Sequence, residues 1–387
     1  MRAEMAKRRI AMTSALMVAC LMSLPSTAAG ATVALPLCEV TNSTAGTAVT
    51  DDLQRAIDSA KPSDVLRIKG VCVGSYSVSK SISLVGAPSS PVPVPALDGA
   101  DAGTVLTLLG QKEARISVTI RDLTIRNGLG GIGGGGIESR RADVVLDGTT
   151  AVIGNQAQHG AGIFFTLGSL TLGAETRVAA NQAYAIGGYG GGVQLRRGAL
   201  ALRDGATVTG NSATVGGGIY TYKGSVLLRD DSSVASNHAS EHAGGIFSYD
   251  APVRVRKRAT VQGNDAQAYG GGVYLGGYRD DRVSLTVTGH ASVTQNTTAR
   301  YGGGIAASLH GLVTLKRHAL VSDNVANVGG GIHSAGVVVF RDESSVVGNT
   351  AQISGGGLFS TGTVTFWPDW LGTVCGNSPD DWPSCAS

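Results

Sequence analysis

Apolar and polar residues alternate in short stretches along most of this chain. Pairs of apolar residues separated by one residue recur about every 27 residues. These pairs are Val144/Leu146, Leu170/Leu172, Leu200/Leu202, Val226/Leu228, Val253/Val255, Leu285/Val287, Val313/Leu315, Val338/Phe340 and Val364/Phe366. Period-two alternation with many β-branched residues predicts strands rather than helices.

Two other marks recur with the same spacing. Two glycines precede an aliphatic residue at Ile137, Ile163, Val193, Ile219, Ile246, Val273, Ile305, Ile332 and Leu358. The pattern Val-x-x-Asn ends at Asn155, Asn181, Asn211, Asn237, Asn264, Asn296, Asn324 and Asn349, with Asn127 and Asn377 as outliers at the ends. Each repeat therefore predicts three short strands: after the glycines, through the alternating pair, and into Val-x-x-Asn.

Three short strands cannot bury a core alone, so the repeats must stack on one another. We predict an all-β fold, a single-stranded right-handed parallel β-helix, or solenoid, with three short strands per coil and about 4.8 Å between coils. The eight regularly spaced Asn residues are expected to form a structural hydrogen-bonded ladder. Asn also tolerates the left-handed backbone conformation better than other non-Gly residues, which suits a tight coil turn.

The two ends of the chain differ from the repeats. A basic start, an apolar stretch at 10–24 and small residues up to Ala31 are typical of a signal peptide. The segment 51–57 predicts an N-capped helix that covers the first coil. We expect a signal peptide at 1–31, an N-terminal cap with irregular coils at 32–115, regular repeats at 116–366 and a C-terminal cap or tail at 367–387.

Cysteine use agrees with export. One of the five Cys residues, Cys20, lies in the predicted signal region. Of the other four, two lie near each end of the chain. This distribution predicts the disulfides Cys38–Cys72 and Cys375–Cys385. Lipid attachment at Cys20 is the alternative to cleavage, and Met17 fits it poorly. We expect a secreted or envelope-surface protein without a transmembrane anchor.

The charge balance gives no case for nucleic acid as a partner. The whole chain carries a formal net charge of +3, and the residues Arg2, Lys7, Arg8, Arg9 and Glu4 sum to the same value. The mature protein is therefore close to neutral. A neutral chain has no general attraction for nucleic acid or for a membrane surface.

The glycine-rich half of the repeat carries a resemblance. Gly-Gly-Gly-Ile ends at Ile137, Ile219, Ile305 and Ile332. The chain resembles the pectin-lyase-like β-helix superfamily and, more narrowly, bacterial surface proteins with repeats of the polymorphic outer-membrane-protein type. Those repeats pair Gly-Gly-x-Ile with Phe-x-x-Asn, whereas every copy here has Val in place of Phe. The resemblance implies the β-helix fold and a surface location.

Aromatic residues give the main candidate for ligand binding. They directly follow the inward aliphatic residue, or lie two positions further along, and would form a ladder on the outer surface. The candidates are Phe164, Tyr220, Tyr222, Phe247, Tyr249 and Tyr274. An exposed aromatic row suits stacking on sugar rings or on a partner protein. The alternative is that these rings stack in the core.

A second candidate is a basic row beside the alternating strands. It comprises Arg203, Arg229, Arg254 and Arg256. Such a row could meet an acidic polysaccharide. Neighbouring Asp residues support the competing interpretation of a solvated charged face that keeps the protein soluble.

No catalytic, metal or cofactor site is predicted. The run Gly128–Gly133 matches G-x-G-x-x-G but precedes a predicted strand, whereas dinucleotide binding needs a helix there. His238 and His242 fit H-x-x-E-H, a zinc motif that requires a helix, in what we interpret as a solvated loop. No clustered acids typical of polysaccharide hydrolases or lyases stand out.

The sequence therefore favours a secreted or cell-surface β-helix protein that acts without catalysis, in adhesion, glycan binding or surface structure. A polysaccharide or a host or cell-surface protein is the expected partner. The alternative is a lyase or glycoside hydrolase acting on an acidic polysaccharide of the pectate type. Clustered acids in a surface groove would favour the enzyme, and aromatic residues without them would favour binding.

Overall fold

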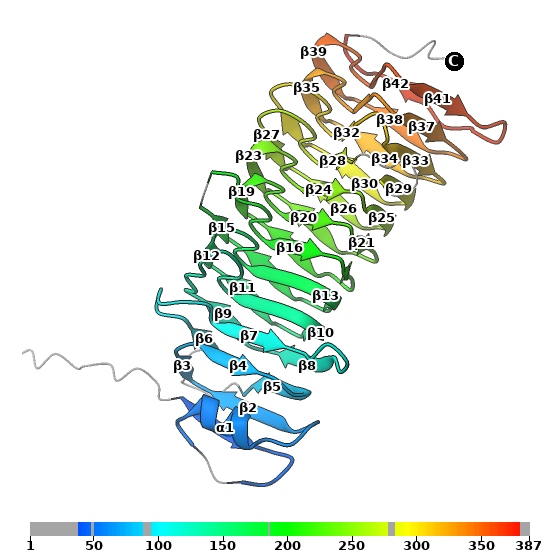
Figure 1. Cartoon of the computed structure of the whole chain (residues 1–387). Coiled ribbons are helices and arrows are strands. Elements are labelled where there is room, and N and C mark those ends of the chain that lie inside the picture. Colours follow the sequence, from blue (N-terminus) through cyan, green and yellow to red (C-terminus); the bar gives the residue numbers. More distant parts are fainter. Residues whose placement is uncertain (1–37, 48–49, 88–93, 185, 278–282, 380–387) are drawn as a thin grey trace, which may run out of the picture. The chain divides into compact units, whose positions relative to one another are not determined.

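The computed structural model describes residues 38–47, 50–87, 94–184, 186–277 and 283–379. They form an all-β parallel solenoid of about 11 turns with one short helix (Figure 1). The predicted fold class is confirmed. The predicted signal peptide lies outside the described residues.

The largest sheet, sheet A, contains two rows of strands. The first row holds the strands that follow the glycines: β4 (Tyr76–Val78), β7 (Leu106–Leu109), β10 (Ile137–Asp147), β13 (Ile163–Leu172), β16 (Val193–Arg196), β20 (Ile219–Tyr222), β24 (Ile246–Tyr249), β28 (Val273–Gly276), β32 (Ile305–Ala307), β36 (Ile332–Ser334) and β40 (Leu358–Ser360).

The second row of sheet A holds the strands of the alternating pairs. It runs through β1 (Glu39–Asn42), β2 (Val65–Lys69), β5 (Ile82–Gly86), β8 (Ile116–Arg121), the long strands β10 and β13 again, β17 (Ala199–Leu202), β21 (Ser225–Leu228), β25 (Pro252–Lys257), β29 (Ser284–Gly289), β33 (Leu312–Lys316), β37 (Val337–Phe340) and β41 (Thr363–Phe366). Pairing is parallel throughout this row except between β1 and β2, which are antiparallel.

Sheet B holds the strands of the Val-x-x-Asn pattern and the equivalent strands of the first coils. Its members are β3 (Val71–Val73), β6 (Ala96–Asp98), β9 (Thr124–Arg126), β11 (Ala151–Ile153), β14 (Arg177–Ala179), β18 (Thr207–Thr209), β22 (Ser233–Ala235), β26 (Thr260–Gln262), β30 (Ser292–Thr294), β34 (Leu320–Ser322), β38 (Ser345–Val347) and β42 (Val374–Cys375).

Sheet C comes from the segment after each Asn, where sequence analysis placed a loop. Its members are β12 (Gln156–Ala157), β15 (Gln182–Ala183), β19 (Ser212–Val215), β23 (His238–His242), β27 (Asp265–Ala266), β31 (Thr297–Thr298), β35 (Val325–Val328) and β39 (Thr350–Ser354). The interpretation of 238–242 as a loop is wrong, because these residues form β23. Half of these strands contain only two residues and are too short to show alternation in the sequence.

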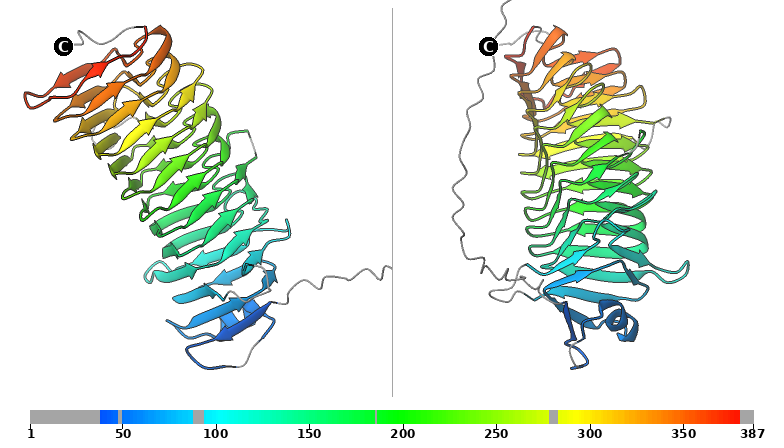
Figure 2. Two further views of the ribbon diagram at one scale, coloured as in Figure 1. Left: turned by 180° about the vertical axis from the view of Figure 1, so that it is seen from behind. Right: turned by 90° about the vertical axis from the view of Figure 1, so that its left-hand side faces the viewer.

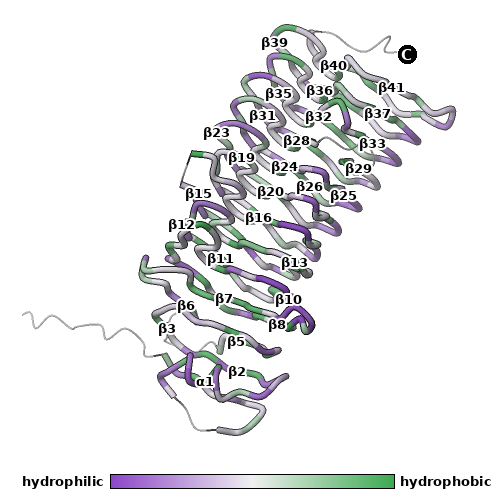
Figure 3. Tube along the Cα trace, in the orientation of Figure 1, coloured by the Kyte–Doolittle hydropathy of each residue, from purple (hydrophilic) through white to green (hydrophobic). Residues whose placement is uncertain are grey.

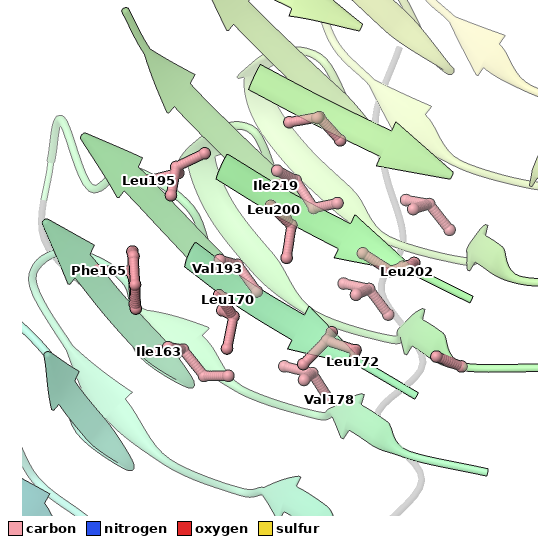
Figure 4. Close-up of a cluster of buried hydrophobic side chains, with 14 of the residues drawn as sticks. Ile163, Phe165, Leu170, Leu172, Val178, Val193, Leu195, Leu200, Leu202 and Ile219 are labelled. Atoms are coloured by element: carbon pink, nitrogen blue, oxygen red, sulfur yellow. The ribbon is translucent and has the colours of Figure 1, made fainter. Parts of the chain in front are cut away.

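The register stacks like residues on like residues, and this builds the core. Ile219 pairs with Ile246, which pairs with Val273, and all three are fully buried. Figure 4 shows the same stacking for Ile163, Val193 and Ile219. Hydrophobic and hydrophilic positions alternate along the coils, as Figure 3 shows. The interior is thus a continuous apolar column in which each coil covers its neighbours.

The Asn side chains form a second, polar column inside the solenoid. Asn237 Oδ1 accepts hydrogen bonds from the backbone N–H and Nδ2 of Asn211, both at 3.0 Å. Asn237 Nδ2 donates to Asn264 Oδ1 at 2.9 Å and to the carbonyl of Val208 at 3.0 Å. The column runs through Asn155, Asn181, Asn211, Asn237, Asn264, Asn296, Asn324, Asn349 and Asn377.

The left-handed conformation does not fall on these Asn residues. It falls on the residue before each, such as Gly154, Ala180 and Gly210, with φ of 65°, 53° and 63°. Among these Asn residues, only the outlier Asn127 has the expected left-handed conformation, with φ of 53°. Its side chain donates to Asp98 and does not join the column. The column Asn residues are needed for their amide groups rather than for their backbone freedom.

The helix predicted near the N-terminus is α1 (Leu53–Ser59). The Asp52 side chain accepts a hydrogen bond from the Arg55 backbone N–H at 2.9 Å, which caps the helix. Its apolar residues Leu53, Ala56 and Ile57 are buried in the core. The helix therefore covers the first coil, and the other end of the solenoid lies opposite it in both views of Figure 2.

The predicted disulfide Cys38–Cys72 is present and joins residues 34 apart in sequence. Cys375 is also disulfide-bonded. Its predicted partner Cys385 lies outside the described residues, so that pairing stays a prediction. Across the described part of the chain, no helix has the length and hydropathy needed to cross a membrane.

Trp370 covers the last coil of the solenoid. Its ring centroid lies 6.0 Å from that of Phe340 and 4.6 Å from that of Phe366. The indole N–H donates to the carbonyl of Ser344 at 2.9 Å. The C-terminal cap at 367–387 stays a prediction.

Candidate functional site

The first row of sheet A presents a column of aromatic rings on its outer face. Tyr220, Phe247 and Tyr274 occupy the same register position in successive coils. Each follows a fully buried aliphatic residue, so period-two geometry directs its ring outward. The centroids of Tyr220 and Phe247 are 5.1 Å apart with an angle of 9° between the rings, and those of Phe247 and Tyr274 are 5.2 Å apart.

Further rings extend this column, and sequence analysis missed those that stand before the glycines. Most of them stand directly before the glycines of a repeat, at the corner between sheets C and A. Together they form what we call the aromatic band, in which ring centroids lie 4.8 to 5.5 Å apart along the order His159, Tyr189, Tyr220, Phe247, Tyr274, Tyr269, Tyr301, His333 and Phe359.

The aromatic band stays continuous because it moves between two register columns. Where the strand position carries Gln194, the ring before the glycines is Tyr189. Where it carries Ala306, that ring is Tyr301. The sequence signal was therefore present, as a Tyr or His immediately before a glycine run.

The remaining predicted rings flank the aromatic band. Tyr222 and Tyr249 pair in register, with ring centroids 5.4 Å apart. Phe164 lies beside Gly133, where a Cβ atom would approach the ring to 3.1 Å. All six candidate aromatic residues thus lie on the outer side of sheet A, and none points into the main core.

Stacking along the band covers the faces of the aromatic rings. Coils about 4.8 Å apart bring each ring against the ring of the next coil. Phe247, between Tyr220 and Tyr274, is only 8% exposed. A sugar that stacks on an aromatic residue needs an open ring face. Stacking in the band therefore stabilises the solenoid, and a ligand site requires ring surface that this stacking leaves open.

Gln194 lies where the band moves from one register column to the other. A hollow of about 250 Å³ opens there, lined by His159, Tyr189, Gln194, Arg196, Tyr220 and Tyr222. Gln194 is only 5% exposed, yet its Oε1 has no hydrogen-bond partner among the described residues. Such an orphaned acceptor is costly unless something donates to it. We call this hollow the Gln194 pocket.

Charge and burial distinguish the walls of the Gln194 pocket. Arg196 is exposed, and its guanidinium makes no ion pair with any side chain in the described ranges. Burial, reinforced by the charge of Arg196, lowers the pKa of His159 below 6.5. Burial raises the pKa of Tyr220, so its hydroxyl remains protonated. The walls therefore combine one cation, neutral hydrogen-bonding groups and aromatic surface.

The basic row lies at the other end of the second row of sheet A. Arg203, Arg229 and Arg256 follow residues that pair in register, so they stack in successive coils. Arg254 lies two positions earlier on the same strand as Arg256. Arg203 and Arg229 approach Asp204 and Asp230 at 3.7 and 3.4 Å, as expected for a charged face with mixed signs.

The H-x-x-E-H motif lies on a strand, and the G-x-G-x-x-G motif lies in a turn that precedes a strand. His238 Nδ1 lies 2.9 Å from Asp265 Oδ2, whereas the His242 ring packs against Tyr269. Among the described residues, no three His, Cys, Asp or Glu side chains gather as a metal site requires. Gly128 donates its N–H to Asn155 Oδ1 at 2.9 Å, and its run leads into strand β10.

The fold and this surface define a parallel β-solenoid with an outer aromatic band. No protein-family model matches the chain, and comparison with curated proteins and with solved structures gave no match. The class of protein therefore rests on the fold, and the narrower family resemblance stays a prediction.

Proposed function

We propose that this protein is a secreted or cell-surface β-solenoid that binds glycans without catalysis, at the Gln194 pocket. The observation that carries the proposal is the buried, unpartnered Oε1 of Gln194 at a hollow lined by aromatic residues. Leaving a buried acceptor unpaired costs about 1 to 3 kcal/mol. A sugar hydroxyl can donate to this oxygen and remove that cost.

The other walls of the pocket suit an acidic sugar. Tyr189, Tyr220 and Tyr222 offer apolar ring surface and hydroxyl groups, which can contact the apolar and polar parts of a sugar. The free guanidinium of Arg196 can bind a carboxylate through two parallel hydrogen bonds. The ligand class proposed is therefore a uronate-containing polysaccharide.

Binding of oligogalacturonate and oligoalginate tests this proposal, with neutral glucan oligosaccharides for comparison. Gln194→Leu removes the orphaned acceptor at similar size, so we expect the melting temperature to stay or rise. Loss of one hydrogen bond to a buried group should weaken binding about tenfold. Arg196→Gln should remove the preference for acidic over neutral oligosaccharides.

Two Tyr→Phe substitutions, one inside the pocket and one outside it, form a test and its matched control. Tyr222 lines the pocket, whereas Tyr301 belongs to the aromatic band outside it. Tyr222→Phe should weaken binding, and Tyr301→Phe should leave it unchanged. Wild-type protein that binds none of these oligosaccharides, or Gln194→Leu protein that binds as well as wild type, would contradict the proposal.

The location and partner of the protein belong to the same proposal. The Cys38–Cys72 disulfide is typical of an oxidising compartment outside the cytoplasm. The resemblance to bacterial surface β-helix proteins also favours the cell surface. A host or cell-surface protein carrying acidic glycans would present the same chemistry as a free polysaccharide.

One observation favours an enzyme as a second candidate. Glu241, His242 and Arg300 line a hollow of about 650 Å³, and His242 Nδ1 is buried without a partner among the described residues. Burial lowers the pKa of His242, which keeps the ring neutral and able to accept a proton. Arg300 could neutralise a uronate carboxylate while His242 removes the adjacent proton.

This second candidate is a polysaccharide lyase. The carbon–oxygen bond to the leaving sugar would break as a carbon–carbon double bond forms, and the leaving oxygen would take a proton. Ultraviolet absorbance of the unsaturated product, measured on polygalacturonate and alginate, decides between the two functions. Turnover that disappears in His242→Gln would make the protein a lyase.

A further inference from the structure

A second hollow lies in the basic row, away from the aromatic band. It is lined by Arg229, Arg256, Lys257, Thr288, Gly289 and Arg317. Strand pairing explains the hollow, because Arg256 pairs with Thr288, and Thr288 pairs with Lys316. Two small residues, Thr288 and Gly289, thus stand in one coil where the coils on either side carry pairs of cations.

The chain cannot fill this gap with a larger residue at Gly289. Its φ is +78°, and a Cβ atom there would lie 3.1 Å from the backbone nitrogen of Lys257. The coils on either side of this one are about 9.6 Å apart, twice the rise of one coil. The volume of about 270 Å³ is several times the ~30 Å³ that one water molecule occupies.

The floor of the hollow carries an unpartnered polar atom. Thr288 is only 6% exposed, and its Oγ1 makes no hydrogen bond with any described group. A buried hydroxyl without a partner is costly. Because Thr288 lines the hollow, its hydroxyl can donate to a ligand oxygen.

The lining is cationic without an internal counter-ion. Four cationic side chains line it, and no carboxylate from the described residues does. Asp230 lies one coil away, where its Oδ1 accepts from Lys257 Nζ at 2.6 Å and its Oδ2 lies 3.4 Å from Arg229 Nε. Asp342 accepts from the backbone N–H of Arg317 at 2.8 Å. Arg256 makes no ion pair within the described ranges.

We propose that this hollow binds a tetrahedral oxyanion, a sulfate or phosphate ester carried on a larger molecule. Cations reach it from the coils on both sides, and a hydroxyl donates from the floor. A tetrahedral group directs oxygens toward all of them at once, whereas a planar carboxylate matches a single guanidinium. This anion site shares no lining residue with the Gln194 pocket, so a failed test of one leaves the other proposal unaffected.

Calorimetric titration with inorganic sulfate, inorganic phosphate, dextran sulfate and a poly(glycerol phosphate) tests the site and its source of anion. Arg256→Gln and Arg317→Gln should each weaken binding about tenfold, the loss expected for one charged hydrogen-bonding partner. Thr288→Val replaces the orphaned hydroxyl by a methyl group of the same shape. It should leave the melting temperature unchanged or raised while weakening anion binding.

Arg254→Gln is the matched control, because Arg254 lies on the same strand, is exposed and does not line the hollow. It should leave binding unchanged. Tighter binding of dextran sulfate assigns a sulfated ligand, and tighter binding of the phosphate polymer assigns a phosphorylated one. Absence of binding to all four probes, or equal weakening by Arg254→Gln and Arg256→Gln, would overturn the proposal.

Discussion

At the scale of single residues, the Asn column shows how a polar group can be buried repeatedly. From Asn181 to Asn349, each amide oxygen accepts two hydrogen bonds from the preceding coil, and each amide nitrogen donates to the next coil and to a backbone carbonyl. Because the partner of each Asn is another Asn, a single substitution leaves groups in two neighbouring coils unsatisfied.

Replacement of Asn324 by alanine should therefore be strongly destabilising. It removes the acceptor of the Asn296 N–H and Nδ2 and a donor to Asn349 Oδ1. We expect a loss of about 3 kcal/mol in the free energy of unfolding, measured by urea denaturation.

The control is Asn327→Ala, three residues away. Asn327 is half-buried, and its backbone N–H donates to the carbonyl of Arg300 in the previous coil, a hydrogen bond that alanine keeps. Its replacement should change stability by about 0.5 kcal/mol or less. Equal denaturation midpoints for the two variants would disprove the structural role of the column.

At the scale of the element, the coil depends on glycines for two distinct reasons. Gly210 has φ of +63° and open space around its Cβ position, so only its backbone conformation favours glycine. Gly218 lacks a positive φ, but a Cβ there would lie 2.7 Å from the carbonyl oxygen of Gly245 in the next coil. The glycines before the inward aliphatic residue thus permit close stacking of coils.

These two reasons predict different costs for the same substitution. Gly210→Ala should cost about 1 kcal/mol, the usual penalty for a left-handed non-Gly residue, and Gly210→Asn less. Gly218→Ala forces neighbouring coils apart and should cost about 2 to 3 kcal/mol. Thermal unfolding of the three variants checks this order, and equal costs for Gly210→Ala and Gly218→Ala would contradict it.

At the scale of the whole molecule, the aromatic band ties consecutive coils together along one face. Two of its members are histidines, His159 and His333, and a third histidine, His242, packs against its member Tyr269. Burial lowers the pKa of each below 6.5. Protonation of these rings in the folded state is therefore unfavourable.

Acid should consequently destabilise the solenoid. With a folded-state pKa below the unfolded value, each histidine binds more protons unfolded, so stability is present above about pH 6.5 and falls as the pH drops. His333→Phe, which keeps the ring stack, should flatten this fall in melting temperature between pH 7 and pH 5. A variant with the same pH profile as wild type would exclude His333 from the effect.

The repeat made most of the fold predictable from sequence. Buried Val and Ile positions, the Asn column, the capping helix and the Cys38–Cys72 disulfide all follow from local patterns that recur at fixed spacing. Sheet C did not, because its shortest strands contain two residues and leave no alternation to detect. The assignment of Asn to left-handed positions failed because the bend falls one residue earlier.

The sequence by itself determined the solenoid architecture, since a repeat that cannot bury its apolar face alone must stack on neighbouring repeats. Only the tertiary structure decided where ligands could bind. Gln194 and Thr288 are unremarkable in the sequence, and each matters because the coils above and below surround a polar atom without satisfying it. Such a mismatch arises between residues about 27 positions apart, so no local pattern could reveal it.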